Sequence, residues 1–372
     1  MTLIVDGTSG VTFNDSSLQG AAASPYVLKN RIINGDMRID QRNAGASVTP
    51  TNGQYTLDRW GAYAFGSATS KFTVQQSSTA PAGFKNSLQV TSTSAYSVAS
   101  GDITAVYQII EGYNVADLDF GTANAKTITI SFWVRSSLTG TFGGSIKNGG
   151  SNRAYPFTYT ISSANTWEQK SVTIAGDTSG TWLTTNGQGL FVIFGLGVGS
   201  TYSGTASAWA SSDLYSATGA TSVVGTNGAT FYITGVQLEQ NTSATPFERR
   251  MITNEIQLCQ RYYEKCGWDQ NSVPGSTSGY TGSIVSNFMG TASTAFEGIN
   301  WMVIKRTAPT LTFYGSILGA TETLGVVVDF NSGNSLGAAS PLRIADCGYG
   351  HFNTTTSSSY GALYRVVASA EL

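Results

Sequence analysis

A single segment of this chain, residues 246–265 (PFERRMITNEIQLCQRYYEK), has the hydrophobic period of an α-helix, and nearly all of the remaining sequence has the pattern of short β-strands. Apolar residues recur in this segment at i, i+4, i+7 and i+11, which places them on one face of a helix. They are Met251 or Ile252, Ile256, Cys259 and Tyr263. A parallel sheet would need crossover helices between its strands. The sequence therefore predicts an all-β fold with antiparallel strands and one helix.

The longest β-patterned region runs from residue 27 to residue 247. Alternating or aromatic-rich runs are separated there by clusters of Gly, Asn, Asp and Ser, and the Asn-Gly pairs among them favour tight hairpin turns. Many short antiparallel strands without intervening helices are typical of a jelly-roll β-sandwich. The expected strands are 31–39, 70–76, 87–91, 105–110, 126–135, 141–147, 168–174, 190–196 and 230–238.

One of these strands, TITISFWVRS (residues 127–136), is rich in large apolar side chains. Its apolar residues are not expected to share one side of the sheet, and a strand that is apolar on both faces lies centrally, under a second layer. The residues are Ile128, Ile130, Phe132 or Trp133, and Val134. Trp60, Trp133 and Trp167 also stand in strand patterns and are expected to be core residues.

The helical segment is expected to join two β-domains over residues 248–267. Thr245 and Pro246 suit the start of a helix, and Gly267 suits its end. A helix of about four turns is marginal alone in water, so its apolar face must pack against a sheet or another subunit. The residues expected at this domain or oligomer contact are Ile256, Cys259 and Tyr263.

The β pattern resumes after the helix and predicts a second, smaller sandwich over residues 268–372. Its expected strands are 281–287, 298–305, 310–314, 324–330, 351–354 and 364–371.

The first 26 residues have a different pattern, with two very short strands expected at 3–5 and 11–13. Two strands of this length are not stable alone in water. They must pair with another chain, another protein or the domain that follows. Residues 1–26 are therefore interpreted as an attachment arm, the alternative being a frayed terminus.

The charge content limits the classes of partner. Of the 372 residues, 20 are Lys or Arg and 22 are Asp or Glu, a net charge of -2 that does not suggest a nucleic-acid partner. The chain shows no signal-peptide pattern and no apolar stretch of membrane-spanning length, so we expect synthesis in a cytoplasm and no membrane insertion. Three cysteines form no disulfide or zinc pattern and are expected to be buried. They are Cys259, Cys266 and Cys347.

The candidate binding residues are aromatic side chains in Gly- and Ser-rich contexts. The region 199–228 is too long for an ordinary connection, and its large aromatic residues argue against disorder. Aromatic faces with nearby amides and carboxylates can bind sugar rings. The expected glycan platform consists of Trp182, Tyr202, Trp209 and Tyr215. The alternative is that these side chains anchor loops or meet another subunit.

Catalytic patterns are weak in this sequence, and no enzymatic activity is expected. The single histidine, His351, leaves no partner for a zinc site and only one candidate for a catalytic triad. Asp117 and Asp119 could serve a glycosidase, but their Gly- and Asn-rich surroundings indicate a turn.

Several of these stretches resemble phage proteins. KNRIINGDMRIDQRNAG with YTLDRW (within 29–60) resembles the start of a module in phage and prophage tail proteins, and VQLEQNTSATPFERRMITNEIQLCQRYYEK (236–265) resembles its closing motif. TLIVDGTSGVTFND is similar to the entry segment of tail fibres, and IKRTAPTLTFYG, with its Arg-x-x-Pro, fits the region that follows the module.

The resemblance implies a virion protein of the tail fibre or receptor-binding type, with a galactose-binding-like jelly roll over 27–247 similar to carbohydrate-binding modules. It further implies a homotrimer, attachment to other virion proteins through the arm, and host surface polysaccharide as a partner. A structural Ca²⁺ would have Asp36 and Asp58 as ligands, although both also suit turn and core hydrogen bonds. The chain lacks a coiled coil, a collagen repeat and a β-helical shaft, so an architectural head-decoration or collar protein is the alternative, and a polysaccharide depolymerase is the third.

Overall fold

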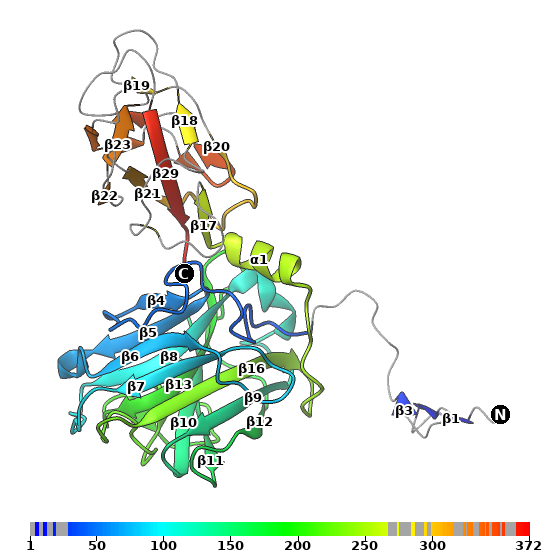
Figure 1. Ribbon diagram of the computed structural model, residues 1–372. Helices are drawn as coiled ribbons and strands as arrows, with labels where there is room; N and C mark the ends of the chain where they lie inside the picture. The colour runs from blue at the N-terminus through cyan, green and yellow to red at the C-terminus, as the bar shows by residue number, and fades with distance from the viewer. Residues whose placement is uncertain are drawn as a thin grey trace.

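The computed structural model describes residues 29–266, 299–315 and 362–372, together with shorter segments. These segments are 4–6, 10–12, 18–19, 274, 284–286, 294–295, 323–324, 326–329, 335–338, 340–341, 344–349 and 352–353. The described part consists mainly of β-strands, with one α-helix beside a large β-sandwich (Figure 1). The predicted all-β, jelly-roll fold class is confirmed.

The sandwich is built from a six-stranded and a five-stranded sheet, both antiparallel. The six-stranded sheet has the order β11 (Ala154–Ile161), β10 (Gly140–Asn148), β13 (Gln188–Val198), β8 (Ile103–Glu111), β5 (Trp60–Phe65) and β4 (Gln54–Leu57). The five-stranded sheet has the order β12 (Glu168–Ile174), β9 (Ile128–Ser136), β16 (Thr230–Gln240), β7 (Ser87–Ser92) and β6 (Phe72–Ser77).

The main core lies between the two sheets. Successive side chains of a strand point to opposite faces, so Val106 and Ile110 of β8 enter this core. Tyr107 and Ile109 of the same strand lie in a second apolar cluster, on the outer face of the six-stranded sheet. Trp60 is fully buried in the main core, as expected, and its indole N–H donates to the backbone oxygen of Asn34 at 3.0 Å.

The other two tryptophans expected in the core are only half-buried. Trp133 lies on the outer side of β9, and Trp167 precedes β12 and meets Tyr232 edge-on, with ring centroids 6.2 Å apart. The expectation that the apolar residues of β9 do not share one side of the sheet was also wrong, because the four even-numbered ones share one face. Ile128, Ile130, Phe132 and Val134 are all fully buried. The strand is nevertheless interior, between β12 and β16.

The strand expected at residues 31–39 is absent, because left-handed residues interrupt the extended backbone there. Asn34 has a φ of 55° and Met37 a φ of 57°. A Cβ on Gly35 would lie 2.3 Å from the backbone oxygen of Val236, so only glycine fits this close approach. Side-chain hydrogen bonds attach the segment to the sandwich, for example between Gln108 of β8 and both backbone groups of Ile33.

The helix α1 spans Ile252–Gln260 and is shorter than expected. Its N-cap is Met251, which makes no side-chain cap, so Thr245 and Pro246 do not start it. Residues Tyr263–Cys266 form strand β17 and not the last helical turn. The proposed stop, Gly267, lies outside the described residues.

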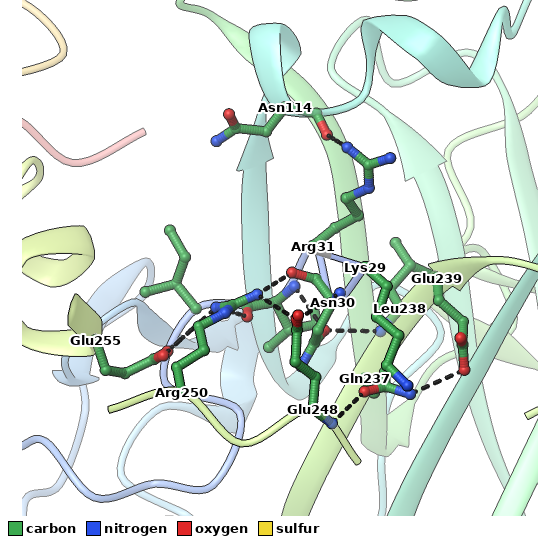
Figure 2. A network of polar contacts seen from close by, with 12 residues as sticks. Lys29, Asn30, Arg31, Asn114, Gln237, Leu238, Glu239, Glu248, Arg250 and Glu255 are labelled. Atoms are coloured by element: carbon green, nitrogen blue, oxygen red, sulfur yellow. Dashed lines mark hydrogen bonds and ion pairs between the residues drawn. The ribbon is translucent and has the colours of Figure 1, made fainter. Parts of the chain in front are cut away.

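Arg250 attaches the start of α1 to the sandwich (Figure 2). Its guanidinium donates to the backbone oxygens of Asn30 and Ile32 and approaches the carboxylates of Glu248 and Glu255. Figure 2 shows Gln237 extending the same network, since its side-chain oxygen accepts the backbone N–H of Glu248 at 2.7 Å. The segment that precedes the first sandwich strand and the segment that follows the last one therefore meet in one hydrogen-bond network.

A second β unit is organised around β29 (Ala362–Ser369), which lies above α1 in Figure 1. This strand pairs with β17, with β18 (Ile284–Ser286), with β21 (Thr310–Gly315) and with β23 (Val326–Asp329). Strands β22 (Thr323–Leu324) and β24 (Ser335–Ala338) extend the same sheet. The other described strands of this unit form two small sheets, of β19 (Thr294–Ala295), β28 (Phe352–Asn353) and β25 (Ser340–Pro341), and of β20 (Ile299–Asn300), β27 (Gly348–Tyr349) and β26 (Ile344–Ala345).

The N-terminal strands form a sheet of their own, with β1 (Ile4–Asp6), β2 (Gly10–Thr12) and β3 (Leu18–Gln19) in that order. The first two are close to the expected strands, and the third was not expected. Their role as an attachment arm stays a prediction. No helix within the described residues is long and apolar enough to cross a membrane.

Candidate functional site

The four candidate glycan-binding aromatics form two separate pairs. Trp182 and Trp209 meet edge-to-face, with centroids 5.7 Å apart, and both contact the main core. Tyr202 and Tyr215 meet in the same way at 5.7 Å, but in the cluster on the outer face of the six-stranded sheet. The loops therefore do not bring all four rings onto one platform.

Phe120 joins the two tryptophans into a three-ring cluster. Its ring meets Trp182 edge-on at 4.8 Å and Trp209 at 5.9 Å. Each indole N–H donates to a backbone oxygen, that of Ser179 at 3.2 Å for Trp182 and that of Ala175 at 2.8 Å for Trp209. The hydrogen bonds and ring contacts fix the orientation of both half-buried indoles.

A pocket of about 120 Å³ opens beside Trp182, and we call it the indole pocket. Besides Trp182, its apolar lining is formed by Val115, Leu118 and Leu190, which are almost fully buried, by the half-buried Phe120 and Ala116, and by the more exposed Leu183. Polar side chains complete its lining. They are Asp119, Thr122 and Thr184.

Two loops held by short turns and backbone hydrogen bonds form the indole pocket. The 3-10 helices η2 (Gly112–Asn114) and η3 (Ala116–Leu118) follow β8 and present the first loop. Tyr113 N–H donates to the backbone oxygen of Thr185 at 2.9 Å, which ties this loop to the 182–187 loop. Asp119 ends η3 with a φ of 54°, and Thr122 donates to its backbone oxygen at 2.7 Å.

Asp117 and Asp119, the two carboxylates considered for glycosidase chemistry, lie in this turn. Asp117 pairs with Arg31 at 2.5 Å, and Asp119 with Lys126 at 3.5 Å. The expected turn is confirmed. The pairs supply each carboxylate with a cation, and both side chains remain about half exposed.

The other aromatic pair belongs to a ladder that crosses the outer face of the six-stranded sheet. Successive ring centroids are 4.2–6.3 Å apart. In order, the rings are Phe65, Tyr202, Tyr215, Tyr63, Tyr107 and Tyr55. Tyr107 and Tyr215 are buried, so this ladder mainly packs the 199–228 region onto the sheet.

Lys147 of β10 also attaches the 199–228 region to the six-stranded sheet. Its buried ammonium donates to Asp213, to Ser151 Oγ at 3.2 Å and to Tyr215 OH at 3.0 Å. Burial lowers the pKa of Lys147, while the hydrogen bond and charge of Asp213 oppose that shift. The expected alternative role of Tyr215 as a loop anchor fits these contacts.

The two candidate calcium ligands have protein partners. Asp36 pairs with Arg38 at 2.5 Å. Asp58 accepts the backbone N–H of Gln41 at 2.7 Å and its side-chain amide at 2.6 Å. The described residues contain no group of three or more His, Cys, Asp or Glu side chains that could hold a metal ion.

The residues expected at the helix contact have three different environments. Cys259 is fully buried in a small cluster with Ile33, Ile39 and Tyr262. Ile256 is half-buried and lines a groove of about 530 Å³ between α1 and the 38–44 segment. Tyr263 lies on β17, where the Arg42 guanidinium stacks 3.7 Å from its ring centroid.

The cysteines and the histidine also differ in position. Cys259 is buried as expected, Cys266 is half-buried, and Cys347 is exposed, which corrects the expectation for that residue. Burial raises the pKa of the Cys266 thiol to about 12, with the nearby Glu264 adding to the shift. His351 lies outside the described residues.

Sequence reasoning missed the contribution of Phe120, Leu183 and Lys147. Phe120 follows the Asp117–Asp119 stretch, which was assigned to a turn without a role for its aromatic neighbour. Leu183 adjoins Trp182, and its 43% exposure shows it as a surface apolar residue. Lys147 had no detectable signal, because its partner Asp213 is 66 residues away.

No family model matches the chain, and no curated protein matches its sequence. The enzymatically active domain of tailspike protein 4 from bacteriophage CBA120 aligns at 16% identity with a TM-score of 0.31, over 59% of this chain and 22% of that structure. A candidate sugar binding protein from Bacteroides thetaiotaomicron aligns at 14% identity with a TM-score of 0.34, over 57% of this chain and 100% of that structure.

A family 11 carbohydrate-binding module from Clostridium thermocellum, in complex with a β-1,3-1,4-mixed-linked tetrasaccharide, aligns at 13% identity with a TM-score of 0.27. That alignment covers 53% of this chain and 98% of the module. This chain spans only 22% of the tailspike structure.

Proposed function

We propose that this chain is a non-enzymatic glycan-binding structural protein of a phage particle, of the tail fibre or receptor-binding type. The indole pocket carries the glycan part of the proposal. It combines an oriented indole, an apolar lining and polar side chains at the surface in one small pocket. Aromatic rings cover the apolar face of a sugar ring, and polar groups bind its hydroxyls.

The phage part rests on the resemblance of residues 29–60 and 236–265 to tail-protein motifs. These motifs are far apart in the sequence but meet in the fold. Asn30 Nδ2 donates to the backbone oxygen of Val236 at 3.1 Å. The side-chain amide of Gln41 donates to the backbone oxygen of Tyr263 at 3.3 Å. These contacts between the two motifs support an architectural module. The indole pocket lies outside both motifs.

Weak single sites would suffice for such a protein. A millimolar site corresponds to about 4 kcal/mol, and linked copies can raise avidity by roughly 100-fold or more. A homotrimer attached to other virion proteins through residues 1–26 would supply the copies. Sedimentation of the full chain would measure the number of copies, and antibody labelling of particles in negative stain would show where the chain lies.

The glycan proposal is tested with Trp182→Ala in the full chain, with Trp167→Ala as the matched control. Both indoles are half-buried, but Trp167 lies outside the indole pocket. We expect Trp182→Ala to reduce binding to host surface polysaccharide by roughly 10-fold or more, since burial of a large apolar side chain is worth about 1.5–3 kcal/mol. Trp167→Ala should bind as the unmodified chain does.

One observation favours the architectural alternative, a head-decoration or collar protein without glycan affinity. Both indole N–H groups already donate to backbone oxygens, as expected of loop anchors. Unchanged particle adsorption to cells with Trp182→Ala, in a variant whose melting temperature is also unchanged, would select this alternative. Loss of polysaccharide on incubation with the purified chain would instead revive the depolymerase hypothesis.

A further inference from the structure

The indole pocket has an apolar inner part and a polar outer part. Val115, Leu118 and Leu190 line it and are 8%, 1% and 0% exposed, so these side chains belong to the sandwich core. Asp119 and Thr184 line the same pocket and reach solvent. A ligand therefore meets hydrocarbon inside the pocket and hydrogen-bonding groups at its mouth.

The volume of about 120 Å³ admits only a small part of a glycan. Pockets that enclose whole drug-sized ligands have volumes of about 300–1,000 Å³. Two or more sugar rings cannot enter, so the group that does enter must project from a ring at the end or side of the glycan. The half-buried Trp182 is placed to contact that ring at the pocket mouth.

The apolar lining discriminates between groups that could project inward. A hydroxyl surrounded by Leu118 and Leu190 would lose its water without a side-chain partner from either, and such burial costs free energy. A methyl group in the same place gains from the removal of its apolar surface from water. Together these effects amount to a roughly 10- to 100-fold preference for methyl over hydroxymethyl.

We propose that the indole pocket selects glycans that carry a methyl group on a terminal or branching sugar, as in 6-deoxyhexoses and N-acetylhexosamines. This inference rests on the proposed glycan-binding function and specifies its substrate class. The methyl enters between Val115, Leu118 and Leu190, the ring lies against Trp182, and ring hydroxyls bind Asp119 and Thr184 at the mouth.

The test uses the full chain and matched pairs of free reducing sugars, which carry no aglycone methyl group. L-Fucose is compared with L-galactose, L-rhamnose with L-mannose, and N-acetylglucosamine with N-glycolylglucosamine, so that each pair differs by methyl against hydroxymethyl. Titration calorimetry measures affinity, and saturation-transfer NMR identifies the protons nearest the protein. We expect the methyl-bearing member of at least one pair to bind roughly 10- to 100-fold more tightly, with the strongest saturation at its methyl protons. The pair that responds identifies the source of the methyl group.

Ala116→Leu is the variant that fills the pocket, and Ala164→Leu is its control. Ala116 lines the pocket and is half-exposed, so the larger side chain can be accommodated without disturbing the core. Ala164 is exposed and lies outside the pocket. Ala116→Leu should remove the methyl preference, and Ala164→Leu should keep it.

Two failures are distinguishable. Equal binding of both members in every pair, together with loss of binding in Trp182→Ala, would overturn the methyl preference and leave the glycan function standing. Absence of binding to all six sugars and to host polysaccharide by the folded chain would overturn both.

Discussion

At the scale of single residues, the most demanding feature is the set of charged side chains buried at the end of the sandwich. Asp58 is fully buried and lies near Gln41, Arg42 and Asp40. Burial raises the pKa of Asp58 to about 6, although the charge of Arg42 and the two hydrogen bonds from Gln41 lower it. This carboxyl therefore couples folding to protonation in mildly acidic solution.

Asp58 should make the chain less stable as the pH rises from about 4 to about 6. In that window the folded chain keeps a proton that the unfolded chain, with a pKa of about 3.9, has released. A difference of about two pKa units corresponds to roughly 2–3 kcal/mol. The unfolding free energy of the unmodified chain minus that of Asp58→Asn should therefore fall by roughly this amount between pH 4 and pH 7.

Urea denaturation of both proteins at intervals of one pH unit measures this difference. Other titrating groups are common to both proteins and largely cancel in it. A difference that stays constant from pH 4 to pH 7 would show that Asp58 has an ordinary pKa in the folded chain.

At the scale of elements, α1 shows where hydrophobic period alone is insufficient. The period continues through Tyr263, which suggested a helix extending to residue 266. The chain instead leaves the helix after Gln260, and Tyr263 pairs with Ser369 in a sheet. This pairing spans more than a hundred residues, so no local pattern could reveal it.

Strand patterns in the sandwich were more predictable, because runs rich in β-branched and aromatic residues are bounded there by clusters of Gly, Asn, Asp and Ser. The expected segments at 105–110, 141–147 and 230–238 lie within β8, β10 and β16. The segment 31–39 failed because its apolar residues are positioned by left-handed turns and by hydrogen bonds from distant side chains. The aromatic site was found only in part. The separation of Trp182 from Tyr202 depends on which face of the sandwich each loop covers, and local sequence does not specify that placement.

Arg250 should contribute far more to stability than its neighbour Arg249. Arg250 is almost fully buried, and Arg250→Ala would leave the buried carboxylate of Glu255 without its cation. Breaking such a buried pair costs about 3–5 kcal/mol. Arg249 is exposed and lies 4.6 Å from the ring centroid of Phe84 and 5.8 Å from that of Phe247, contacts worth about 0.5–1 kcal/mol each.

Chemical denaturation of Arg250→Ala and Arg249→Ala under one set of conditions compares the two arginines. Equal and small losses would mean that the network in Figure 2 contributes little to the docking of α1.

At the scale of the whole molecule, the described end of the chain links the second β unit to the sandwich. Glu371 follows β29 and pairs with Arg42 at 2.6 Å and with Arg59 at a shorter distance. Arg306 donates to the backbone oxygens of Ala370 and Glu371, and also to that of Asn186 in the loop that includes Leu183. The junction thus connects the second β unit to one side of the indole pocket.

Glu371→Gln should weaken this junction, because Arg59, which is 1% exposed, would lose its carboxylate partner in a buried site. We expect a loss of about 3–5 kcal/mol, and calorimetry should show the second β unit melting separately from the sandwich. Glu168→Gln is the control, since the Glu168–Lys170 pair lies within one strand and is partly solvated, and such pairs are worth about 1 kcal/mol or less. If Glu371→Gln melts in one transition at the temperature of the unmodified chain, the two units are held together by their apolar contacts, such as those of Leu372, and not by the buried charges.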